Sequence, residues 1–136
     1  MMSPLIAIID DDAGIREALR TLLRSATYRA EAFASAEAFV ASEGSSRSDC
    51  IITDIAMQGM SGLELAGLLK SRGCTVPVIL ISALTDEDLE RQAQLNGAQC
   101  LLRKPIESNT LISQVEESLA CRRTDAGTVA LASHWY

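Results

Sequence analysis

The sequence predicts an α/β fold in which five parallel strands alternate with five helices. Short apolar segments of strand length recur along the chain, and each is followed by a segment whose apolar residues recur at helical spacing. A strand that is apolar along its whole length is typical of a parallel sheet covered on both faces. We therefore expect a three-layer sandwich with right-handed crossovers between successive strands.

The five expected strands differ in their apolar pattern. The first and third are apolar throughout and end in carboxylates, as central strands do. In the second, apolar residues alternate with Arg29 and Glu31, which indicates an edge strand. Pro77 lies near the start of the fourth, where a lost backbone donor matters least. The expected strands cover residues 5–9, 28–33, 50–54, 76–81 and 98–102.

The expected helices follow the strands in order. Asp12 can cap the first, because a short carboxylate accepts hydrogen bonds from the N–H groups of the first turn. The fourth is polar, and we expect Leu89, Ala93 and Leu95 to be its apolar anchors. The helices are expected at about residues 15–26, 35–41, 63–71 and 85–96, with a last one carrying Leu111, Ile112, Val115 and Leu119.

Length and charge limit the classes of function. A chain of 136 residues fits one domain, expected at residues 1–121, with residues 122–136 as a tail or a truncated linker. The net charge of −6 is poorly suited to direct nucleic-acid binding, so a protein partner or a cation is expected. Neither a membrane span of ~20 apolar residues nor an export signal is recognisable. We therefore expect a cytoplasmic location and no membrane partner.

The cysteines and the single histidine give no sign of a zinc or redox site. No two cysteines form a C-x-x-C pair, so the spacing typical of zinc ligands is missing. We expect the cysteines to be small buried apolar side chains. His134 lies alone in the tail, where a metal or phosphohistidine role is not expected. The cysteines are Cys50, Cys74, Cys100 and Cys121.

Polar side chains follow four of the expected strands. They are Asp10 and Asp11 after the first, Asp54 after the third, Ser82 after the fourth and Lys104 after the fifth. Each alone has an ordinary explanation as a helix cap, a turn residue or a solvated charge. Together they lie on one rim, because the carboxyl ends of parallel strands share one edge of the sheet, where ligands bind.

Clustered carboxylates and a lysine suggest phosphoryl chemistry with a metal. Carboxylates packed together repel one another, which raises a pKa or requires a cation. Oxygen ligands in small number suit Mg²⁺. A carboxylate can attack a phosphoryl group and carry it covalently, while Mg²⁺ and Lys104 offset the charge on the transferred oxygens. The Ser82 hydroxyl is placed to hydrogen-bond that group.

With these residues in this order, the chain resembles a response-regulator receiver domain, the phosphoacceptor half of bacterial two-component signalling, over about residues 5–120. Residues 35–39 further resemble receivers of the nitrogen-fixation-regulator type. The residues that carry the resemblance are Ile8-Ile9-Asp10-Asp11-Asp12, Thr53-Asp54, Met57, Met60-Ser61-Gly62, Ile81-Ser82-Ala83 and Lys104-Pro105.

The resemblance implies a flavodoxin-like fold with strand order 2-1-3-4-5. It implies that Asp54 is the phosphoacceptor and that Lys104 is the phosphate partner. The Lys104–Pro105 peptide is expected to be cis. The remaining implied site residues are Asp10, Asp11, Asp54 and the Ala56 main-chain carbonyl for Mg²⁺, and Ser82, Ala83 and Leu101 for the switch.

The resemblance also implies partners. A sensor histidine kinase or a phosphotransfer protein would donate the phosphoryl group, and the chain itself would be no enzyme beyond its own phosphorylation and dephosphorylation. The output surface would be the fourth helix, fifth strand and fifth helix, through which a homodimer is expected.

Several positions depart from the family pattern. Gln58 stands where proline is usual, which predicts a looser loop, and Leu101 and Ile106 stand where aromatic residues are common. The conformational change on phosphorylation is therefore expected to be a shift of the fourth helix and of the loop before it. Ala56 and Leu84 lie at the positions that often orient the hydrolytic water, and neither side chain can hydrogen-bond to water. We expect the phosphoryl group to be lost slowly.

Two other functions stay open as alternatives. One is a binding module that keeps the fold but works without phosphorylation, against which the intact Asp54 and Lys104 argue. The other is a phosphotransferase or hydrolase acting on small molecules, which is disfavoured because Ala56, rather than a second carboxylate, lies two residues after Asp54. No glycine-rich phosphate loop supports nucleotide binding.

Overall fold

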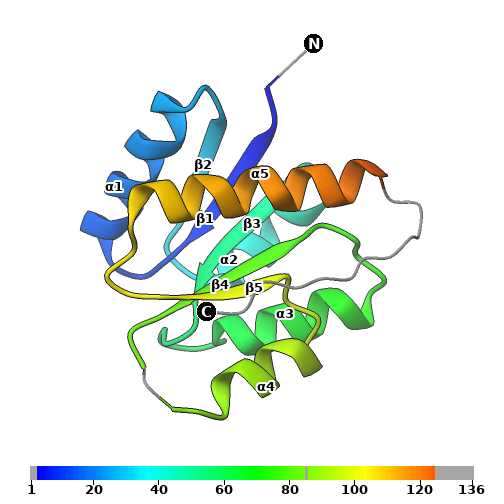
Figure 1. The fold of residues 1–136 in the computed structure, drawn as a ribbon. Helices are drawn as coiled ribbons and strands as arrows, with labels where there is room; N and C mark the ends of the chain where they lie inside the picture. The colour runs from blue at the N-terminus through cyan, green and yellow to red at the C-terminus, as the bar shows by residue number, and fades with distance from the viewer. Residues whose placement is uncertain (1–2, 85, 125–136) are drawn as a thin grey trace.

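Five parallel strands form one sheet in the order β2-β1-β3-β4-β5, as predicted (Figure 1). The structure is a computed structural model and describes residues 3–84 and 86–124. The strands are β1 (Leu5–Ile9), β2 (Arg29–Phe33), β3 (Cys50–Asp54), β4 (Val78–Ser82) and β5 (Cys100–Arg103). The helices are α1 (Ala13–Ser25), α2 (Ala36–Ala41), α3 (Gly62–Ser71), α4 (Leu89–Leu95) and α5 (Ser108–Thr124), with a short 3₁₀ turn, η1 (Gly44–Ser46).

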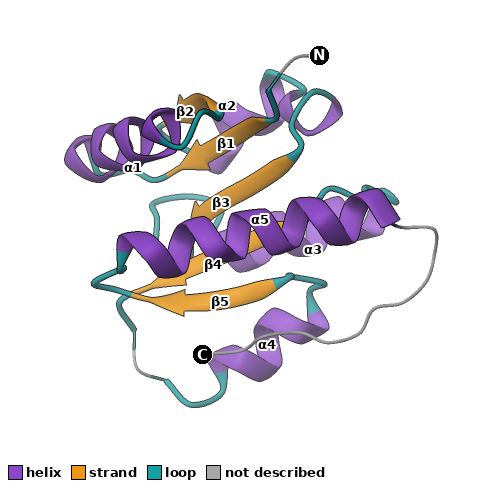
Figure 2. Ribbon diagram, turned by 45° about the horizontal axis from the view of Figure 1, so that its top comes forward, coloured by secondary structure: helices purple, strands orange, loops and turns teal. Residues whose placement is uncertain are grey.

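The helices form two layers, one on each face of the sheet (Figures 1 and 2). Alternate residues of a strand point to opposite faces, so Ile6 and Ile8 of β1 pack with α1 and α5, while Ala7 and Ile9 pack with α2, α3 and α4. β3 and β4 are buried along their whole length. The strand ends are therefore held by a sheet that is covered on both sides.

Short polar side chains begin several helices. The Asp12 carboxylate accepts a hydrogen bond from the Ile15 N–H at 3.1 Å, so the predicted cap of α1 is confirmed. The Ser35 hydroxyl accepts from the Ala38 N–H at 3.0 Å at the start of α2. Ser61 and Glu64 form a reciprocal capping box at α3. These caps fix where the chain turns from each strand or loop into the next helix.

The fourth helix is shorter than the sequence predicts. It begins at Leu89, because the Asp86 carboxylate accepts the Asp88 N–H at 2.9 Å and so stabilises a turn instead of a helix. Leu89 and Ala93 are buried, as predicted, but the prediction that Leu95 is an anchor is wrong, since 61% of it is exposed. Residues four apart share a helix face, and Leu95 falls on the opposite side.

Other boundaries differ by a few residues. β4 begins at Val78, two residues later than predicted. The Pro77 carbonyl accepts the Ile51 N–H at 2.9 Å, but proline has no N–H with which to donate to the sheet. β5 begins two residues later than predicted. α5 runs to Thr124 and so includes the first three residues of the segment expected as a tail, while residues 125–136, with His134, lie outside the described residues.

The cysteines are not uniformly buried. Cys50 and Cys100 lie in the core as predicted, and Cys74 is half-buried. The prediction is wrong for Cys121, which is exposed near the end of α5. Within the described ranges, every helix is too short or too polar to cross a bilayer.

Candidate functional site

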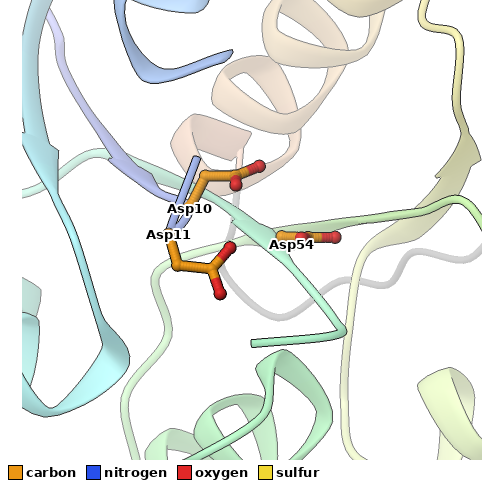
Figure 3. Close-up of side chains that lie close together, drawn as sticks. All are labelled: Asp10, Asp11 and Asp54. Carbon is orange, nitrogen blue, oxygen red and sulfur yellow. The ribbon is translucent and has the colours of Figure 1, made fainter. Parts of the chain in front are cut away.

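Three carboxylates meet at the carboxyl ends of β1 and β3. These strands are neighbours, with Ile9 paired to Thr53, so the residues that follow them lie side by side. Carboxylate oxygens of Asp10, Asp11 and Asp54 all lie within 4.8 Å of one another (Figure 3). Asp10 and Asp54 are buried, with 2% and 6% exposed, whereas Asp11 is exposed to solvent. The cluster is therefore buried on one side and open to a ligand on the other.

Lys104 brings a positive charge to the same place. Its ammonium nitrogen lies 3.6 Å from Asp10 Oδ2 and 3.4 Å from Asp54 Oδ2. Lys104 follows β5, and its N–H donates to the Ser82 carbonyl at 2.9 Å, which ties the ends of β4 and β5 together. The peptide between Lys104 and Pro105 is cis. The structure thus brings together the groups that the sequence places after strands one, three and five.

Burial raises the pKa of Asp54 above its usual value. The second cause is the negative charge of Asp10, and the Lys104 ammonium and the Ile55 N–H act in the opposite direction. An ionised Asp54 is therefore costly in this site unless positive charge lies beside it. A cation that binds between the carboxylates would remove this cost.

Hydrogen bonds fix Asp10 in place. Its Oδ1 accepts the Asp12 N–H at 2.9 Å, and its carbonyl accepts a hydrogen bond from Arg16 Nη1 at 2.7 Å. In the sequence, Arg16 falls on the polar face of α1. Several arginines share that face, so the sequence offers no signal that singles out this one.

The end of β4 carries the predicted switch residues. Ser82 is fully buried, and its hydroxyl oxygen accepts the Leu84 N–H at 2.9 Å. Ala83 is exposed beside it. The Leu84 carbonyl accepts a hydrogen bond from Arg103 of β5. The loop before α4 is thus held both by the serine and by the neighbouring strand, and Arg103 is a contact that sequence reasoning missed.

Leu101 lies in the core rather than at a movable surface position. It is fully buried and packs in the cluster of α2, α3 and α4. Because an aliphatic side chain fills this position, the described site contains no aromatic ring next to Ser82 that could change place.

The loop after Asp54 approaches the strand end closely. Gly62 begins α3 where a Cβ atom would collide with the Asp54 carbonyl oxygen, so only glycine fits. Its N–H donates to the Ile55 carbonyl at 3.1 Å, and the Ile55 N–H donates to the Ile81 carbonyl at 2.9 Å. Ala56 is exposed on this loop. The predicted main-chain ligand therefore lies two residues from Asp54 in an anchored loop.

The donor set fits a hard cation. All side-chain donors are carboxylate oxygens, they are few, and Asp11 leaves the cluster open to water. Mg²⁺ favours such sites, because it keeps several of its waters and takes one or a few carboxylates. Burial and the negative charge of Asp10, which together raise the pKa of Asp54, are the cost that a divalent ion would offset.

Comparison with known proteins agrees with the fold and shows the family. The family model for the response regulator receiver domain matches residues 6–116. The transcriptional regulatory protein TdiR of Thauera aromatica is 35% identical over 118 residues, covering 87% of this chain and 52% of TdiR. FixJ of Azorhizobium caulinodans is 37% identical over 114 residues, covering 84% of this chain and 54% of FixJ. The chain thus spans about half the length of these relatives.

Solved structures show the same architecture. The response regulator StyR superposes with a TM-score of 0.81 at 35% identity, covering 90% of this chain and 63% of StyR. The structure titled FixJ-N superposes with a TM-score of 0.80 at 29% identity, covering 96% of this chain and all of that one.

Proposed function

The chain belongs to the response-regulator receiver family of two-component systems, and we propose that it accepts a phosphoryl group on Asp54 with Mg²⁺ bound beside it. The observation that supports this most strongly is the convergence of three carboxylates and Lys104 on one rim of the sheet. The acceptor is the one carboxylate of the three that ends the central strand β3.

In the proposed reaction a carboxylate oxygen of Asp54 attacks phosphorus. The bond between phosphorus and the donor breaks, the donor leaves with that electron pair, and an aspartyl phosphate forms. The nucleophile must be ionised, which the raised pKa of Asp54 opposes and the Lys104 ammonium favours. The chain would catalyse only its own phosphorylation and dephosphorylation.

Asp10, Asp11 and Asp54, with the Ala56 carbonyl, would hold Mg²⁺. The ion would supply positive charge to the oxygens of the transferred group. Lys104 would then exchange part of its contact with Asp54 for a phosphoryl oxygen, since a phosphoryl group carried on Asp54 would lie beside the same ammonium. The same four charged side chains, three carboxylates and one ammonium, would thus serve both the unphosphorylated and the phosphorylated site.

The switch would act through Ser82. The buried Ser82 hydroxyl would donate to the phosphoryl group while its oxygen accepts the Leu84 N–H, so any displacement of the serine toward the phosphoryl group would pull on Leu84. Leu84 is tied to Arg103, so β5 and the loop before α4 would respond together. The phosphoryl group shifts the equilibrium between two arrangements of Ser82 and the loop before α4 only if it interacts more favourably with one of them than with the other.

The proposed donor is a sensor histidine kinase or a phosphotransfer protein, and the proposed output surface is α4, β5 and α5. Several relatives bear names of transcriptional regulators, and the match covers only about half of their length, so control of a linked or separate output domain is part of the proposal. Self-association through the same surface is the mode we propose for a dimer.

Intact mass spectrometry tests the proposal. The chain is incubated with Mg²⁺ and a small acyl phosphate, beside Asp54→Ala and, as a control at a remote carboxylate, Glu116→Gln. We expect one added phosphoryl group in the wild type and in Glu116→Gln and none in Asp54→Ala. A mass gain that survives Asp54→Ala would refute the assignment. If no gain occurs with any donor, and Mg²⁺ binding survives loss of Asp10 and Asp11, the phosphorylation-independent module is favoured instead.

A further inference from the structure

Glu37 reaches from α2 into the loop that follows Asp54. It lies in the first turn of α2, and its Oε2 accepts the Met60 N–H at 2.7 Å. Met60 belongs to the segment of residues 55–61 that joins β3 to α3, which we call the acceptor loop. This hydrogen bond therefore connects the loop to an element that lies outside both β3 and α3.

The Glu37 carboxylate lies directly against the backbone of Gly59. Gly59 has φ of +78°, a conformation that side chains disfavour, and a Cβ atom there would collide with the Glu37 carboxylate. The Met60 N–H holds the pKa of Glu37 below its usual value, helped by the backbone N–H of Glu37 itself. The carboxylate is thus charged at neutral pH and accepts a charge-assisted hydrogen bond.

The contact completes the anchoring of the loop. Its base is fixed by the hydrogen bonds of Ile55 and Gly62, and the side chains of Met57 and Met60 pack against the core. Its tip is fixed by Glu37. Ala56 lies between base and tip. The sequence predicted a looser loop because Gln58 replaces a proline. The structure shows a hydrogen bond between α2 and the loop, which the backbone preferences of the loop residues alone do not reveal.

We infer that Glu37 is a positioning residue for the acceptor loop. Its hydrogen bond to the Met60 N–H restrains the loop in the shape in which the Ala56 main chain serves the Mg²⁺ site. The restraint lowers the entropy that the loop loses when the ion binds, a role that proline at position 58 would otherwise fill. This inference rests on the proposed function, since it concerns Mg²⁺ at the same site.

The test compares Glu37→Gln with Glu116→Gln, which makes the same change in charge on the exposed face of α5. Mg²⁺ affinity is measured by titration calorimetry, and exchange of the Met60 amide by NMR. We expect Glu37→Gln to bind Mg²⁺ roughly three- to tenfold more weakly, somewhat less than the ~10–100-fold effect of residues that hold ligands directly. We also expect faster exchange of the Met60 amide, with no change in Glu116→Gln.

A second variant separates positioning from general stability. Adding Gln58→Pro to Glu37→Gln should recover most of the lost Mg²⁺ affinity, because proline limits the same loop by another route. If the Met60 amide exchanges faster but Mg²⁺ affinity stays within twofold of the control, Glu37 only anchors α2 and the inference is overturned. An unchanged Met60 exchange rate overturns it as well. If the wild type binds no Mg²⁺, the proposed function itself fails, and the inference fails with it.

Discussion

The ammonium nitrogen of Lys104 lies 3.4 Å from Asp54 Oδ2, so the residue proposed to accept a phosphoryl group already has a counterion from the far edge of the sheet. Burial and Asp10 raise the pKa of Asp54, and Lys104 limits that rise. Two consequences of this balance can be measured without any phosphoryl donor.

Replacing Lys104 by methionine should raise the pKa of Asp54 further. The substitution removes both the charge and the hydrogen bond that favour the ionised carboxylate. Carboxyl-carbon NMR titration in Mg²⁺-free buffer measures this pKa. Lys70→Met is the matched control, because Lys70 donates to the Leu95 carbonyl on the surface. An Asp54 pKa that falls, or that moves equally in both variants, would contradict the assigned contact.

Asp54→Asn should stabilise the Mg²⁺-free protein at neutral pH. The folded state holds a proton on Asp54 up to a higher pH than the unfolded state does. Wild-type stability therefore falls as pH rises from the ordinary aspartate pKa through the raised one, and the loss persists above it. The uncharged side chain avoids this loss, so we expect a Tm increase of about 2–5 °C that disappears in acid.

In millimolar Mg²⁺ the wild type should become more stable than Asp54→Asn, which reverses the order expected without the ion. An ion that binds only the folded state raises Tm, and it needs the carboxylate that Asp54→Asn lacks. Thermal melts with and without Mg²⁺ measure both effects. A variant that is stabilised by Mg²⁺ as much as the wild type would show that Asp54 is no ligand.

The phosphorylated protein should lose its phosphoryl group slowly, and a polar side chain at position 84 should accelerate the loss. Leu84 is 45% exposed near the site and offers water no hydrogen bond. We expect the aspartyl phosphate of Leu84→Gln to be hydrolysed faster than that of the wild type, by up to ~10²-fold if the amide positions the attacking water. Leu95→Gln is the control, since Leu95 is also exposed but lies on α4. Mass spectrometry over time gives the rates, and equal rates in all three proteins would refute the hypothesis.

The cysteines should differ in their reaction with iodoacetamide. Burial, with the nearby charge of Glu117, raises the pKa of Cys100 to about 12, so almost no thiolate exists near neutral pH. Cys121 is exposed and should be alkylated first. Peptide mapping after brief labelling measures this, and labelling in urea gives the reference in which all four thiols react. Labelling of Cys100 as fast as Cys121 in the folded protein would contradict the burial.

The sequence was sufficient for the sheet and for most of the site because both depend on local patterns. Apolar segments that end in Asp10, Asp54, Ser82 and Lys104 specify strands, and parallel pairing places their ends together. The start of α4 was mispredicted because the Asp86 side chain forms a turn that helical spacing does not reveal. Glu37 and Arg16 were missed as contacts because each bonds a backbone group whose position depends on the packed fold.

The contact of Lys104 with Asp10 joins the first strand of the sheet to the residue after the last. β1, β3, β4 and β5 must all be docked before the carboxylates and the lysine meet, and long-range parallel pairing is formed slowly. A partly folded chain that lacks only β5 would have the carboxylates without their counterion. Formation of the Lys104 contacts with Asp10 and Asp54 in a refolding experiment would therefore mark the docking of β5 onto a sheet in which β1, β3 and β4 are already paired.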